Sequence, residues 1–191
     1  MPRHKNIKTA LIEETIRQVA AVGHARVTLR SVAAHCGIAH SSVYKHFASR
    51  QALLDATHPY IRARLYAHIR RACAQKSECE PFIVVCAAFI RFMRAHPTYF
   101  ELLYTPQALR CYPTQEHPLH YYFASSAPVF HAYFQRCGVP ESARNLMASL
   151  CGGLLCGVTC MLNQHALNFR GSYEQLVEQL CIKQLHLVPL R

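Results

Sequence analysis

The sequence predicts an all-α protein with a small basic N-terminal part and a larger, nearly neutral C-terminal part. Apolar residues recur at helical spacing through most of the 191 residues, and no segment alternates convincingly in the way of a β-strand. Residues 1–76 hold 13 Lys and Arg against 3 Asp and Glu, whereas residues 77–191 hold 8 against 7. The N-terminal part is therefore suited to a polyanionic partner.

The first helix is expected at residues 6–22. Ile12, Ile16 and Val19 lie on one stripe of this segment, and charged residues lie elsewhere. Gly23 follows as a stop signal. The pattern predicts an amphipathic helix that buries one face.

A longer helical pattern runs from Ser49, which is suited to cap it, to about residue 76. Pro59 lies inside this pattern and is expected to bend or split the helix. Further helices are expected at 80–95, 98–105, 119–136, 141–167 and 173–187, separated by segments that contain Pro or Gly.

Residues 28–47 form two segments around one glycine, and each is too short to be a stable helix alone. Thr28 is a good N-cap for the first segment, and Gly37 can take the left-handed conformation that ends it. Apolar positions of the first segment follow the spacing of a buried helix face: Leu29, Val32, Ala33 and Cys36. In the second segment Ala39, Val43 and Phe47 share a face. Two short helices that cross at a glycine turn describe a helix-turn-helix.

The other face of the second segment carries short hydroxyls, imidazoles, a phenol and an ammonium group. Such a helix fits the major groove of DNA, where short side chains meet base edges and Tyr or Lys reaches phosphate oxygens. The candidate DNA-contacting residues are Thr28, Arg30, His40, Ser41, Ser42, Tyr44, Lys45, His46 and Arg50.

Residues 28–57, "TLRSVAAHCGIAHSSVYKHFASRQALLDAT", resemble the tetracycline-repressor (TetR) family of bacterial transcription regulators. The resemblance rests on the opening Thr28–Arg30, on "CGI" at 36–38, on "VYKHF" at 43–47 and on "SRQALL" at 49–54. It implies an all-α homodimer with a helix-turn-helix domain at 1–50. A helical domain at 51–191 would bind a small ligand and would pair with the same domain of a second copy of the chain. The default role in the family is repression of transcription through a pseudo-palindromic operator.

The resemblance places Thr28, Tyr44, His46 and Arg50 against phosphates, and His40, Ser41, Ser42 and Lys45 toward the groove. Two positions depart from the family pattern. Many members have Ser at the position of Ala39, so the second helix lacks its usual cap, at a cost on the order of 1 kcal/mol. Many have Lys or Arg at the position of His40, whereas an imidazole gains its charge only as the pH falls toward 6. DNA binding is therefore expected to tighten toward pH 6.

The segment from 82 to 134 is rich in aromatic residues and poor in charge, so an effector is expected to be largely apolar and uncharged. Aromatic side chains at helical spacing also fit an ordinary core. The candidate effector-contacting residues are Phe89, Phe92, Met93, Phe100, Tyr104, Tyr122, Phe123 and Cys156. Arg91, Arg94 and Glu101 are the nearby charged residues, and solvated faces account for them equally well.

Residues 145–169 contain no Asp, Glu, Lys or Arg and are long enough to cross a bilayer. Glycines and polar residues within the segment, and the lack of an aromatic belt, favour instead a helix buried between two subunits. The candidate dimer residues are Leu150, Gly153, Gly157, Leu176 and Leu180. We expect no membrane partner.

Ten cysteines invite a disulfide or metal interpretation, but no CxxC occurs and no apolar leader opens the chain. A reducing cytoplasm, small buried cysteines and no metal or other cofactor are expected. The sequence lacks a glycine-rich phosphate loop, HExxH and GxSxG, so an enzyme is not expected. A cysteine-based redox or metal sensor with the same DNA-binding domain stays open as the alternative.

Overall fold

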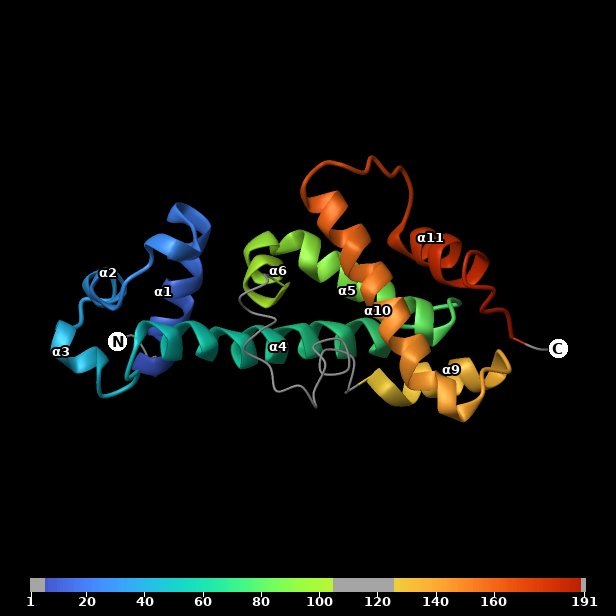
Figure 1. The fold of residues 1–191 in the computed structure, drawn as a ribbon, viewed down its shortest axis with the longest axis horizontal. Coiled ribbons are helices and arrows are strands. Elements are labelled where there is room, and N and C mark those ends of the chain that lie inside the picture. Colours follow the sequence, from blue (N-terminus) through green and yellow to red (C-terminus); the bar gives the residue numbers. More distant parts are fainter. Residues whose placement is uncertain (1–5, 105–125, 190–191) are drawn as a thin grey trace. The chain divides into compact units, whose positions relative to one another are not determined.

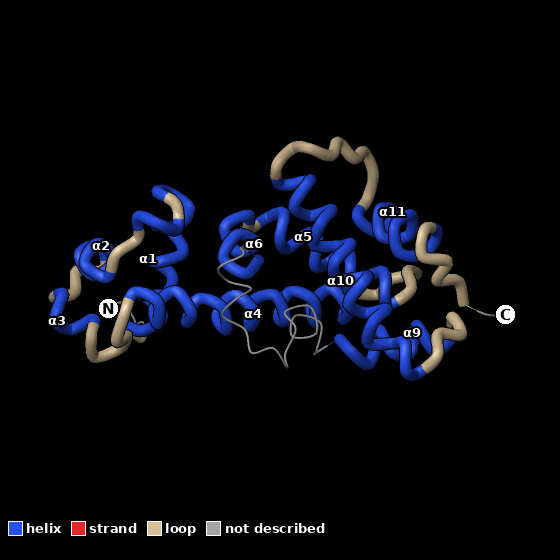
Figure 2. The backbone as a smooth tube through the Cα atoms, viewed as in Figure 1, coloured by secondary structure: helices blue, strands red, loops and turns tan. Residues whose placement is uncertain are grey.

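The structure is a computed structural model, and it describes residues 6–104 and 126–189. All regular elements in these two ranges are helical, as predicted (Figures 1 and 2). The described residues form two compact units. Unit 1 holds residues 6–63 and 101–104, and unit 2 holds residues 64–100 and 126–189.

Unit 1 begins with α1 (Ile7–Val22), whose start is capped when the Asn6 side chain accepts from the Lys8 N–H. The helix ends at Gly23, where φ is +79°. A short 3₁₀ turn, η1 (His24–Arg26), leads to α2 (Leu29–His35) and α3 (His40–Val43). The core of unit 1 is made of apolar side chains that are all nearly inaccessible: Leu11, Val19, Val27, Val32, Val43, Phe47, Leu53 and Leu54.

The long helix α4 (Arg50–Ala74) belongs to both units and is continuous. Ser49 accepts from the Ala52 N–H (3.1 Å), which confirms its capping role. The expectation that Pro59 splits the helix is wrong. Buried residues lie on both sides of the proline, and their packing offsets its missing N–H donor.

The other helices are α5 (Pro81–Ala95), α6 (Pro97–Tyr104), α9 (Ala127–Arg136), α10 (Glu141–Asn163) and α11 (Tyr173–Val177), and a π-helical turn, η3 (Glu178–Lys183), follows α11. α6 is shared between the units. α10 ends four residues earlier than expected, because the chain turns at His165 with φ of +56°. The first part of the helix expected at 119–136 lies outside the described residues.

The core of unit 2 is built on stacked aromatic rings. The Phe82 and Tyr133 rings are parallel, with centroids 4.4 Å apart, and Phe130 and Phe134 pack against Phe82. The Tyr133 hydroxyl donates to the Leu187 carbonyl (2.6 Å). This bond fastens the segment after η3 to α9.

Candidate nucleic-acid interface

Thr28 and Gly37 mark the two ends of α2, as the sequence predicts. The Thr28 hydroxyl oxygen accepts from the Ser31 N–H (3.0 Å), which caps the helix. At the other end Gly37 has φ of +65°, and the N–H groups of Gly37 and Ile38 bond to the carbonyls of Ala34 and Ala33. This pattern is a Schellman motif, which turns the chain sharply toward α3.

α3 buries one side and exposes the other. Val43 is fully buried, and Phe47 just beyond the helix is 4% exposed. Seven of the nine predicted DNA-contacting residues are exposed: Thr28, Arg30, His40, Ser41, Tyr44, Lys45 and His46. Ser42 is half-buried. A polar helix with one buried edge is the shape that enters a major groove.

The start of α3 is uncapped. Ala39 occupies the N-cap position and makes no side-chain hydrogen bond there, as its methyl group requires. The His40 and Tyr44 rings meet edge to face, with centroids 5.2 Å apart. This contact joins two candidate DNA-contacting residues on successive turns.

Arg50 has a different environment from the one predicted. Its Nε donates to the Val27 carbonyl (2.7 Å) and its Nη2 to the His24 carbonyl. These bonds fix the loop before α2 to the start of α4. Arg50 is therefore first a structural residue of unit 1, and no local pattern indicates these distant backbone partners.

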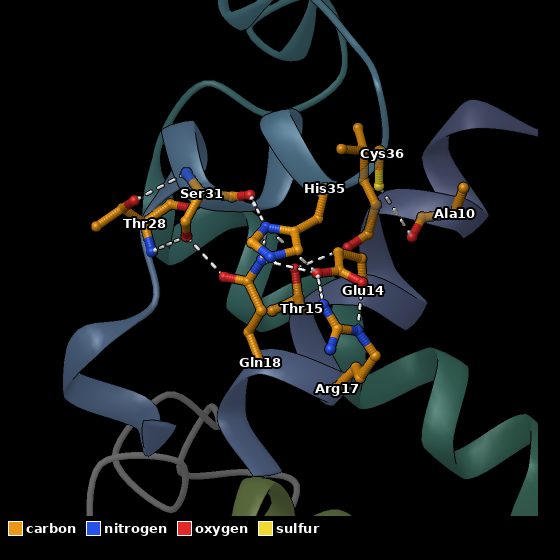
Figure 3. Close-up of polar contacts among 10 residues, drawn as sticks. Ala10, Glu14, Thr15, Arg17, Gln18, Thr28, Ser31, His35 and Cys36 are labelled. Carbon is orange, nitrogen blue, oxygen red and sulfur yellow. Dashed lines mark hydrogen bonds and ion pairs between the residues drawn. The ribbon is translucent and has the colours of Figure 1, made fainter. Parts of the chain in front are cut away.

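A polar network between α1 and α2 was not predicted (Figure 3). Gln18 accepts from the Ser31 hydroxyl (2.6 Å) and donates to Glu14 Oε1 (2.8 Å). Glu14 also accepts two hydrogen bonds from Arg17, and these hold the pKa of Glu14 below its usual value. A helical-wheel count could have found Gln18, because it lies three and seven residues after buried positions of α1.

Thr28 has a defined hydrogen-bonding capacity. Its oxygen already accepts from Ser31, so its own O–H proton remains for a partner that only accepts. A phosphate oxygen is such a partner. The exposed position of Thr28 suits that contact.

The predicted effector-contacting residues of α5 lie in the core of unit 2. Phe89 and Met93 are fully buried, and Phe92 contacts the rings of His68, His96 and Tyr99. Phe100, Tyr104 and Cys156 are half-buried, and Tyr122 and Phe123 lie outside the described residues. The solvated-face interpretation is wrong for Arg94, which donates to the Leu162 carbonyl (2.5 Å). His68 is also partly enclosed, because its Nε2 is buried and burial lowers its pKa.

The predicted dimer residues divide into exposed and buried sets. Leu150, Gly153 and Gly157 are exposed and lie on one face of α10. Leu146 (64% exposed) and Met161 (45%) extend the same face by helical spacing. We call the five residues from Leu146 to Met161 on this face the α10 stripe. Leu176 is 4% exposed because α11 packs it against its own unit, so its prediction as a contact residue is wrong, and Leu180 is half-buried.

Within residues 6–104 and 126–189, the buried Cys181 thiol has a pKa that its hydrogen bond with Cys151 lowers. No group of three or more His, Cys, Asp or Glu suited to a metal occurs there. Burial raises the pKa of the Cys86 thiol, and a hydrogen bond with Cys181 together with burial raises that of Cys151. A thiol held protonated in a dry core is a poor nucleophile.

Among the described residues, α10 alone has the length and apolar composition of a membrane span. The core helix of a soluble protein satisfies the same criterion, so this is weak evidence for a membrane. In the most apolar part of α10, 33% is buried within the chain.

A glycine turn that presents a polar helix on a basic helical unit defines a helix-turn-helix DNA-binding protein. Residues 11–57 match the sequence model of the family described as "Bacterial regulatory proteins, tetR family". No curated protein matches the chain significantly.

Solved structures share the fold of the whole chain. A protein of unknown function from Rhodococcus sp. RHA1 has a TM-score of 0.76 and 18% identity, with 98% of each chain covered. A TetR-like transcriptional regulator from the same organism has a TM-score of 0.65 and 14% identity, covering 97% of this chain and 98% of that one. A TetR family transcription regulator from Marinobacter aquaeolei VT8 has a TM-score of 0.64 and 16% identity, with 96% of each chain covered.

Residues 11–57 thus match the DNA-binding domain of the TetR family, and the whole chain has the fold of solved TetR-like regulators. Regulators of this family are generally not enzymes.

Proposed function

We propose that this chain binds a pseudo-palindromic DNA operator as a homodimer and represses transcription in the cytoplasm until a small, largely apolar effector releases it. The exposed polar face of α3 carries the proposal. His40, Ser41 and Lys45 are exposed there, opposite the buried Val43. The N-terminal part of the chain adds basic charge for the phosphates, since most of the net charge of +11 lies in residues 1–76.

The α10 stripe supports the homodimer. Its large side chains are exposed, and a methyl group added at Gly153 or Gly157 would meet no atom within 4 Å. An apolar face with two glycines lets a second helix approach closely. Two-fold pairing on this face would present two copies of α3 to half-sites separated by whole turns of DNA.

The length of α4 supports a route from effector to DNA. The helix begins in unit 1 with the Arg50 contacts and ends in unit 2, so a ligand that repositions its C-terminal part would also move α3. Effector binding then lowers the operator affinity. The factor is the ratio of the effector's affinities for the released and the DNA-binding arrangements of the protein. The low charge of α5 and α9 favours an apolar effector.

Selection of genomic DNA fragments by the purified protein at moderate salt tests DNA recognition. We expect enrichment of an inverted repeat, because base-edge contacts discriminate between sequences whereas phosphate contacts do not. Enrichment of no common sequence would overturn the proposal, since a purely electrostatic binder has no preference.

Two substitutions sharpen this test. Lys45→Ala should relax the preference at one or two base pairs of each half-site, because Lys45 is assigned to the groove. Tyr44→Phe removes only a hydroxyl assigned to a phosphate, so it should weaken binding about equally for all sequences. A uniform loss of affinity for Lys45→Ala, together with a relaxed base preference for Tyr44→Phe, would contradict the assigned roles.

A further inference from the structure

We propose that Gln18 is a positioning residue for DNA binding, whose carboxamide sets the Ser31 hydroxyl and thereby the direction in which the Thr28 hydroxyl donates to a phosphate. The inference rests on the proposed DNA-binding function. Gln18 lies on α1, is 6% exposed and makes no contribution to the polar face of α3. Its role would therefore be indirect.

The orientation of the Gln18 carboxamide follows from its two neighbours. The Glu14 carboxylate only accepts hydrogen bonds, so the Gln18 nitrogen faces it at 2.8 Å. The Gln18 oxygen then faces the Ser31 hydroxyl at 2.6 Å. A flipped amide would place two oxygens together at Glu14, so the arrangement is unique.

The Ser31 hydroxyl has one proton and two possible acceptors. The Gln18 oxygen lies at 2.6 Å and the Thr28 carbonyl at 2.9 Å. When the proton points to Gln18, the lone pairs of the Ser31 oxygen are available to the Thr28 N–H, which lies 3.2 Å away. Both halves of the capping box are then satisfied without competition.

When both hydrogen bonds of the capping box are formed, the Thr28 hydroxyl group can still donate one hydrogen bond. Its oxygen accepts from the Ser31 N–H at 3.0 Å, which fixes the side-chain rotamer. The O–H proton of Thr28 is then left to donate to an acceptor outside α2. Loss of Gln18 would let the Ser31 proton turn to the Thr28 carbonyl and loosen this geometry.

His35 and Arg17 close the network on the α1 side. The His35 Nδ1 lies 2.8 Å from the Ser31 carbonyl, a contact that requires the Nδ1–H tautomer and leaves no lone pair for the Gln18 nitrogen at 3.2 Å. Glu14 therefore remains the acceptor for Gln18. Arg17, 2.6 Å from the Glu14 carboxylate, keeps that group charged.

A double-mutant cycle on operator affinity tests the role. Gln18→Met keeps the volume and removes both hydrogen bonds, and Thr28→Val removes the donating hydroxyl together with the cap that its oxygen forms on α2. Gln18→Met should weaken binding about fivefold per half-site, as expected for one hydrogen bond, and Thr28→Val by at least as much. The double variant should bind no worse than Thr28→Val, because Gln18 acts through Thr28. Multiplied losses in the double variant would mean an independent structural effect and would overturn the proposal.

Thr15→Val is the matched control. Thr15 is also buried on α1, but its hydroxyl bonds to the Leu11 carbonyl of its own helix (2.7 Å). It should leave operator affinity within about twofold of wild type. An equal loss for Thr15→Val and Gln18→Met would assign both to general weakening of α1.

Gln18→Glu gives a second readout if Gln18→Met folds poorly. The new carboxyl group faces the Glu14 carboxylate, with Arg17 and His35 nearby, so the two repel until one takes a proton. The affinity ratio of variant to wild type should therefore rise from pH 8 to pH 5.5, and a constant ratio would overturn the proposal. Selection of genomic DNA fragments by the wild-type protein separates the proposed DNA-binding function from the proposed role of Gln18. No enriched repeat refutes the proposed function and Gln18's role with it, whereas normal selection with unchanged Gln18→Met affinity refutes the role alone.

Discussion

Replacement of Leu150 by Ala tests the homodimer at the middle of the α10 stripe. Leu150 is 51% exposed in the single chain, and complete burial of a leucine side chain contributes about 1.5–3 kcal/mol. Covering the exposed half would then contribute about 1 kcal/mol per protomer. A two-fold interface contains the residue twice, so the dimer should lose about 2 kcal/mol. That loss is roughly a 30-fold increase in the dimer dissociation constant.

Sedimentation equilibrium over a concentration series measures this constant directly. Val22→Ala is the matched control, because Val22 is 47% exposed but lies on α1 in unit 1, whereas the α10 stripe lies in unit 2. It should leave the dimer constant unchanged. An effect of Leu150→Ala below about threefold, or an equal effect of Val22→Ala, would refute the assignment of the interface to α10.

Three more predictions concern helix α10, helix α3 and the pH dependence of stability. Gly153→Ala combined with Gly157→Ala should raise the melting temperature of dilute monomer, because each change adds about 1 kcal/mol of helix propensity in open space, yet it should weaken the dimer in sedimentation. Ala39→Ser should tighten operator binding up to about fivefold in fluorescence anisotropy by capping α3. Burial lowers the pKa of His58, so the unfolded chain takes up protons first; the free energy of unfolding should fall as the pH drops below about 6.5, and less so in His58→Gln by denaturant titration.

The parts of the fold that were predictable depend on local chemistry. Thr28 and Gly37 marked the ends of α2 because a cap hydroxyl and a residue with positive φ act within a few positions of the chain. The exposed and buried faces of α3 followed from the spacing of Val43 and Phe47 in the same way. Neither inference needed knowledge of a distant partner.

The parts that were missed depend on partners far along the chain. Arg50 bonds to carbonyls 23 and 26 positions away, and Gln18 to a hydroxyl 13 positions away. A sequence pattern shows that such side chains are polar but not which group they meet. Leu176 was misjudged for a related reason, since apolar residues of a core and of an interface have the same spacing.

The brevity of α3 has a consequence for its local dynamics. It has four residues and no side-chain cap, and Val43 and Phe47 anchor it to unit 1. Its few backbone bonds can open without disturbing α1, so its amide protons should exchange with solvent faster than those of the longer helix. Contact with an operator would have to order this segment, and the entropic cost of ordering grows with temperature. Such a protein would release its operator on warming before the rest of the fold melts.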